Sequence, residues 1–75
     1  MQTRKVRLDY PLERVQEPVV SYLVKKYDVA PNVLAADIDA GKGGWLLLEL
    51  QGEGPQIDAA LRWVKDQGIA VQDAP

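Results

Sequence analysis

Three carboxylates near the centre of the chain, Asp37, Asp39 and Glu49, are the side chains whose type and spacing best suit chemistry. Carboxylates on neighbouring strands can converge on a hard cation, but such an ion takes six or more oxygen ligands. Neither a ligand-rich loop nor a glycine-anchored calcium motif surrounds these three. Acid–base catalysis would need one carboxylate to be desolvated, and nothing nearby indicates such burial. We therefore expect solvated carboxylates, with no metal site and no catalytic pair.

A glycine-rich segment, Gly41-Lys42-Gly43-Gly44, is the second candidate for chemistry. A phosphate-binding loop would join a strand to a helix, whose N-terminus helps to hold the anion. Here the flanking residues alternate as in strands on both sides. The segment therefore predicts a hairpin turn.

The residue types that are missing exclude several functions. The 75 residues include no histidine and no cysteine, which removes the usual base near neutral pH, thiolate chemistry, iron–sulfur clusters and cysteine zinc sites. A net charge of -2 argues against a nucleic-acid partner. No segment approaches the roughly 20 apolar residues of a membrane span, and the N-terminus lacks a signal-peptide run. We expect a cytoplasmic protein that is not an enzyme, uses no cofactor and does not insert into a membrane.

Periodicity predicts six elements around these residues. Alternation of apolar and polar residues indicates strands, and apolar residues at helical spacing after Pro18 and Pro55 indicate helices. The predicted order is strand 4–10, helix 17–28, strand 33–40, strand 45–51, a helix from Pro55 to just before Gly68, and a short strand at Ile69 and Val71.

This order predicts one α+β domain over residues 1–75 with the ferredoxin-like β-α-β-β-α-β fold. Right-handed crossovers place both helices on one face of a four-stranded antiparallel sheet, with strand order 4-1-3-2. The strand residues expected beneath the helices are Val6, Leu8, Leu34, Ile38, Leu46, Leu48, Leu50, Ile69 and Val71. Those expected on the uncovered face are Lys5, Arg7, Val33, Ala35, Asp37, Trp45, Leu47 and Glu49.

The uncovered face should carry apolar side chains. Val33, Ala35, Trp45 and Leu47 would lie in water in a monomer, and contiguous exposed apolar surface often marks an interface. The alternative is an ordinary scatter of surface residues, with Trp45 folded over its own hairpin. On the same face, Lys5 or Arg7 would lie within reach of Glu49 on the neighbouring strand.

Asn32 stands directly before the predicted second strand and has two interpretations. An asparagine there can satisfy backbone groups at the strand entrance. Its amide can equally hydrogen-bond a ligand, because it offers donors and an acceptor together.

Four segments in order resemble the NIL domain family: Glu17–Leu23, Asn32–Leu34, Leu46–Gly52 and Ile57–Val64. The family is named for an Asn-Ile-Leu motif, which reads Asn-Val-Leu here. The resemblance implies the same ferredoxin-like fold. It covers almost the whole chain, but no nucleotide-binding loop or ATPase domain accompanies it, so the chain resembles a freestanding module or a fragment.

The resemblance also implies a function. The best understood NIL domains form the C-terminal regulatory domain of the ATPase subunit of bacterial methionine importers, where they pair as dimers and bind methionine. Others precede a ferredoxin-type iron–sulfur domain, which suggests a link to sulfur metabolism. We accordingly expect a homodimeric regulatory module that senses methionine or a related amino acid or sulfur metabolite through Asn32, Val33 and Leu34. The alternative is a ligand-free interaction domain that docks to a transporter ATPase or redox partner.

Overall fold

The chain alternates strands and helices in the predicted order. The computed structural model describes residues 1–11, 18–39 and 41–74. The elements are β1 (Gln2–Tyr10), α1 (Val19–Tyr27), β2 (Ala30–Asp39), β3 (Gly43–Gly52), α2 (Gly54–Asp66) and β4 (Ala70–Asp73).

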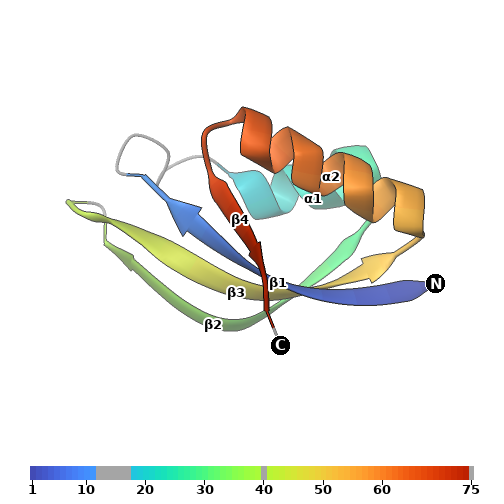
Figure 1. Ribbon diagram of the computed structural model, residues 1–75, viewed down its shortest axis with the longest axis horizontal. Helices are drawn as coiled ribbons and strands as arrows, with labels where there is room; N and C mark the ends of the chain where they lie inside the picture. Colours follow the sequence, from blue (N-terminus) through green and yellow to red (C-terminus); the bar gives the residue numbers. More distant parts are fainter. Residues whose placement is uncertain (12–17, 40, 75) are drawn as a thin grey trace.

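The four strands form one antiparallel sheet in the order β2-β3-β1-β4, which is the predicted order read from the other edge. Both helices lie side by side on one face of this sheet (Figure 1). Neither α1 nor α2 covers the other face, which is called the open face below. The ferredoxin-like prediction is confirmed.

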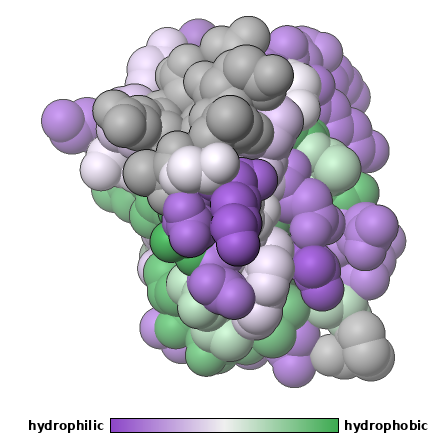
Figure 2. Space-filling model, turned by 90° about the vertical axis from the view of Figure 1, so that its left-hand side faces the viewer, coloured by the Kyte–Doolittle hydropathy of each residue, from purple (hydrophilic) through white to green (hydrophobic). Residues whose placement is uncertain are grey.

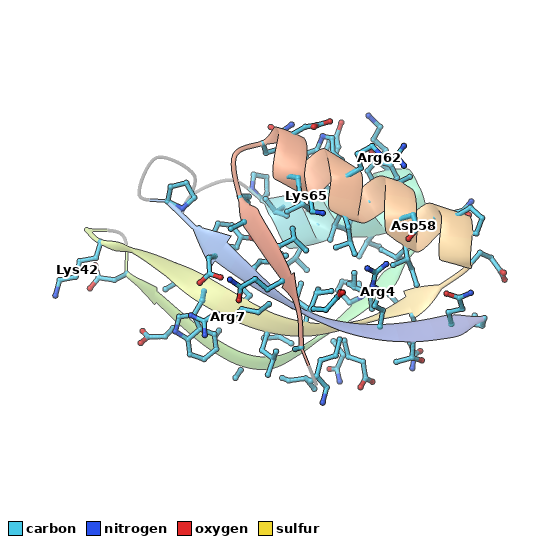
Figure 3. All side chains as sticks on the ribbon, viewed as in Figure 1. Arg4, Arg7, Lys42, Asp58, Arg62 and Lys65 are labelled. Atoms are coloured by element: carbon cyan, nitrogen blue, oxygen red, sulfur yellow. The ribbon has the colours of Figure 1, made fainter. Side chains whose placement is uncertain are left out.

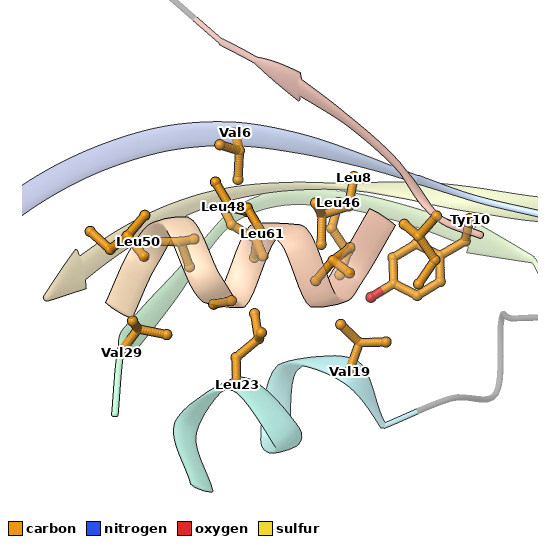
Figure 4. Packing of buried hydrophobic residues seen from close by; sticks show 14 residues of the cluster. Val6, Leu8, Tyr10, Val19, Leu23, Val29, Leu46, Leu48, Leu50 and Leu61 are labelled. Atoms are coloured by element: carbon orange, nitrogen blue, oxygen red, sulfur yellow. The ribbon is translucent and has the colours of Figure 1, made fainter. Parts of the chain in front are cut away.

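The core lies between the helices and the central strands. Val6 and Leu8 of β1 stand opposite Leu48 and Leu46 of β3, so their side chains share the helix-covered face. Ile57, Ala60, Leu61 and Val64 of α2 pack onto them, as do Val19 and Leu23 of α1 (Figure 4). Burial of these side chains is the main contribution to stability in such a short chain.

Proline and glycine mark the helix ends as predicted. Pro18 is the N-cap of α1, and Pro55 occupies the first turn of α2, where a missing N–H costs nothing. Lys25 and Lys26 lie in the last turn of α1, where they complement the helix dipole. Gly68 has φ of 86°, the left-handed conformation that ends α2. Glu17, the predicted first residue of α1, lies outside the described residues.

The predicted faces of β2 are partly wrong because the strand contains a β-bulge. Val33 pairs with Leu48, but Ala35 pairs with Leu47, so Leu34 is an extra residue without a partner. Val33 therefore shares the side of the sheet that carries Leu48, and does not lie on the open face. Ala35 lies on the open face as predicted.

Leu34 and Ile38 were predicted to be core residues and are exposed instead, at 43% and 44%. Part of the reason is length. The nine residues of α1 span about 14 Å at 1.5 Å per residue, whereas the ten residues of β2 span about 33 Å. The β2–β3 hairpin therefore extends past α1 and α2 (Figure 1), and neither helix lies above the far half of β2.

Candidate ligand-binding and interface site

Asn32 is the third residue of β2, not the residue before it. The strand begins at Ala30 and runs through Pro31, which is tolerated because β2 is an edge strand. Asn32 is exposed, and its side chain makes no hydrogen bond to another described residue. Within that part of the chain the amide does not cap a strand entrance, and its donors and acceptor face solvent.

Asn32 belongs to a row of polar side chains on the open face. It stands opposite Glu49 of β3, and Glu49 in turn stands opposite Lys5 of β1. Directly opposite residues have Cβ atoms about 4.5–5.5 Å apart. An amide, a carboxylate and an ammonium group therefore follow one another across three strands, and we call these three residues the polar row.

Arg7 lies beside the polar row and covers the tryptophan of β3. Its Cζ lies 5.0 Å from the ring centroid of Trp45, and its Nη2 lies 3.0 Å from Asp9 Oδ1. Arg7 projects from the open face (Figure 3). Trp45 and Leu47 are consequently half-buried, so the open face exposes less apolar surface than the sequence predicts.

The exposed apolar surface of the sheet lies along β2 instead. Val33 is 50% exposed, and with Leu34 and Ile38 it forms what we call the edge strip. In the space-filling view, apolar side chains gather at the lower left of the molecule, within the sheet layer (Figure 2). As an edge strand, β2 also presents backbone N–H and C=O groups that no strand pairs within residues 1–11, 18–39 and 41–74.

A mostly apolar cavity of about 490 Å³ opens at the start of β2. Its lining residues include Val24 of α1, Val29 of the α1–β2 connection and Pro31 of β2, together with Gln51 and Gly52 at the end of β3. Asn32 follows Pro31 directly. We call this feature the β2-start cavity; its volume falls within the roughly 300–1,000 Å³ that is usual for small-molecule sites.

The three carboxylates considered for metal binding are not brought together. Asp37 stands opposite Trp45, Asp39 opposite Gly43, and Glu49 opposite Asn32, so they lie at different levels of the hairpin. Asp39 Oδ1 accepts a hydrogen bond of 2.7 Å from the N–H of Gly41, which stabilises the turn. Among the described residues, no three His, Cys, Asp or Glu side chains are placed to hold a metal ion.

Among the titratable groups of the described residues, Tyr10 has a clearly shifted pKa, and its side chain belongs to the core. It is 6% exposed, and burial raises the pKa of its phenol to about 12 because the charged form would be desolvated. Tyr10 pairs with Gly44 near the hairpin turn, at the other end of the sheet from Asn32. Because Tyr10 lies far from Asn32 and its phenol stays protonated at neutral pH, it does not act as an acid or a base at the candidate site.

Two contacts that the sequence did not reveal lie on the helix side. The rings of Tyr22 and Trp63 stack with centroids 4.4 Å apart, joining α1 to α2. Arg4 bridges Asp58 of α2 and Asp73 of β4, with N–O distances of 3.0 and 3.2 Å. Both join residues distant in sequence, so no local pattern could have found them.

The molecule is thus a ferredoxin-like domain with an exposed amide and apolar strip on its edge strand. The NIL domain family matches residues 4–73. Methionine import ATP-binding protein MetN of Helicobacter hepaticus is 36% identical over 59 residues, which cover 75% of this chain and 17% of that protein. Methionine import ATP-binding protein MetN 1 of Listeria innocua is 31% identical over 71 residues, covering 91% and 21%.

A solved structure has the same fold. The C-terminal domain of an ABC transporter ATP-binding protein from Enterococcus faecalis superposes with a TM-score of 0.81 at 23% identity, covering 93% of this chain and 81% of that one. The chain belongs to the NIL domain family. It spans about a fifth of the length of the curated relatives it matches. No helix in the described part of the chain is long and apolar enough to cross a bilayer.

Proposed function

We propose that this protein is a non-catalytic regulatory module that binds methionine or a related amino acid or sulfur metabolite as a homodimer. The observation that carries the proposal is the exposed Asn32 on the edge strand of a NIL domain whose relatives are methionine import ATP-binding proteins. Its proposed ligand contacts are Asn32, Val33 and Leu34. Association with an ATP-binding subunit of this kind would place the protein in the cytoplasm.

The chemistry around Asn32 supports an amino acid as the ligand. A free amino acid carries a carboxylate and an ammonium group on one carbon, and the polar row offers donors at Asn32 and Lys5 and an acceptor at Glu49. Val33 and the β2-start cavity offer apolar surface close to Asn32 in the chain, with Val33 on the other side of the β2 edge from the polar row, so we propose that the ligand contacts both sides of this edge. Such surface suits an unbranched, polarizable thioether, which adapts readily to an irregular site.

The proposed homodimer uses the β2 edge. Two copies of β2 can pair through their free backbone groups, which would cover the edge strip at the same time. Val33 and Ala35 would lie within this interface. Trp45 and Leu47 would lie at its margin on the open face, beside β2.

Calorimetric titration with methionine tests the ligand proposal. The wild type should bind, and Asn32→Ala should weaken binding about tenfold or more, because removing one polar partner leaves the other unpaired. Gln72→Ala is the matched control, since it removes an exposed amide from the other edge strand. Equal affinities of Asn32→Ala and Gln72→Ala would exclude Asn32 from the site.

The free edge of β2 also favours a second candidate function. An unpaired edge strand accepts a strand from another protein as readily as from a second copy. In that case the module docks to a transporter ATPase or redox partner without a ligand. Sedimentation separates the two functions: a monomer unaffected by methionine and related metabolites supports the docking function and contradicts the first.

A further inference from the structure

A charged groove lies between α2 and β4, at the sheet edge opposite β2. We call it the α2–β4 groove. Its volume is about 300 Å³, the lower end of the usual range for small-ligand sites. Leu61 and Val71 line it with apolar atoms, and charged side chains from β1, α2 and β4 surround them. Neither Asn32 nor the edge strip contributes to it.

Arg4 is held in place within this groove. Its Nη1 donates to Asp58 Oδ1 at 3.0 Å, and its Nη2 donates to Asp73 Oδ1 at 3.2 Å. Arg4 and Asp58 face each other between β1 and α2 (Figure 3). A guanidinium group has five N–H donors in a fixed plane, so the Arg4 fork keeps donors for a further acceptor. Its Nε also donates to Asp73 Oδ1, at 3.4 Å, so the two carboxylates orient the fork in this structure.

Two more cations lie on the α2 side of the groove. Arg62 and Lys65 are three residues apart, so they share one face of the helix. Neither forms an ion pair with another described residue. Three cations against the carboxylates of Asp58 and Asp73 leave the groove positive, whereas the whole chain carries -2.

We propose that the α2–β4 groove binds the phosphate group of a small organic phosphate. Fixed guanidinium and mobile ammonium donors are the groups that bind phosphate oxygens in proteins. Asp58 and Asp73 are exposed acceptors at the same opening, and they suit the hydroxyl groups of a phosphorylated sugar. A groove of 300 Å³ exceeds the size of free phosphate. The acidic chain argues against a nucleic acid as the source of the phosphate.

Titration of the ¹⁵N-labelled protein, followed by amide chemical shifts, tests this proposal. Ribose 5-phosphate should shift the amides of residues 58–65 and 71–73 to saturation, while sodium chloride at matched ionic strength and unphosphorylated ribose should not. Inorganic phosphate should bind at the same amides but more weakly. Equal affinity for inorganic phosphate and ribose 5-phosphate would overturn an organic ligand, and equal shifts with chloride would overturn the site itself.

Matched variants make the test specific to this groove. The double variant Arg62→Gln with Lys65→Gln should weaken ribose 5-phosphate binding about tenfold or more, through the loss of charge-assisted hydrogen bonds. Lys25→Gln with Lys42→Gln removes two positive charges from α1 and the hairpin turn and should leave the affinity unchanged. Equal weakening in both double variants would show general screening and overturn the proposal. Circular dichroism checks that all variants are folded.

Discussion

Replacement of Ile38 by lysine tests whether burial of the edge strip stabilises the proposed homodimer. Full burial of a Val, Leu or Ile side chain is worth about 1.5–3 kcal/mol. The edge-strip residues remain 50%, 43% and 44% exposed, so a partner strand that covers them would gain roughly 1 kcal/mol from each. Ile38→Lys forfeits that gain in both protomers, or about 2 kcal/mol per dimer.

This loss corresponds to a dissociation constant about 30-fold higher. Two further effects act in the same direction, because an edge lysine opposes strand pairing and its ammonium group would have to be desolvated. Absolute affinity does not follow from buried area, but the difference between two variants of one interface is more reliable. We therefore expect an increase of at least about 30-fold.

Sedimentation equilibrium over a range of concentrations measures this increase directly. Gln72→Lys adds the same charge to β4, the other edge strand, without removing exposed apolar surface, and should leave the dimer intact. If Ile38→Lys dimerises as tightly as the wild type, the β2 edge is not the interface. If both variants dissociate alike, net charge and not the edge strip controls association.

Two stability predictions follow from the core and the hairpin. Between pH 10 and 12 the unfolded chain loses the Tyr10 proton while the folded protein keeps it, so stability should fall with rising pH by up to about 3 kcal/mol. Urea unfolding of wild type and Tyr10→Phe at several pH values checks this, since the variant should lose that part of the slope. Gly44→Ala should lower the free energy of unfolding by roughly 3 kcal/mol, because the new methyl group would lie 2.5 Å from Ile38 Cα. Gly41→Ala, whose methyl group would lie 3.3 Å from Asp39 Oδ1, should cost much less, and equal losses would refute the steric argument.

The central strands were predictable because their pattern reports burial directly. Every second residue is large and apolar from Val6 to Tyr10 in β1 and from Leu46 to Leu50 in β3. Both strands lie beneath the helices, so alternation and burial coincide there. Pro18 at the N-cap of α1, Pro55 in the first turn of α2 and Gly68 after α2 mark the boundaries for equally local reasons. Where the local backbone preference and the tertiary contacts agree, a single sequence is sufficient to predict the element and its buried face.

The edge strand β2 was predicted less well for two physical reasons. A bulge at Leu34 reverses the sides of the residues before it relative to strict alternation, and neither glycine nor proline marks it in the sequence. The apolar residues beyond the bulge then remain exposed because α1 is too short to cover them. The apolar character of these β2 residues predicted that they would be buried, but the length and position of the neighbouring helix determine whether they are.

The difference in length between α1 and β2, together with the bulge, explains why the candidate ligand site and interface lie on the β2 edge. A fully covered β2 would hide its apolar residues and leave only Asn32 and the other open-face groups to meet a partner. The short α1 and the bulge instead place an amide, apolar side chains and free backbone groups along one edge. On the opposite edge, Val71 and Asp73 of β4 line the α2–β4 groove, which shares no residue with Asn32 or the edge strip. Ligands bound at the two edges need not compete, so methionine should not displace ribose 5-phosphate from the groove.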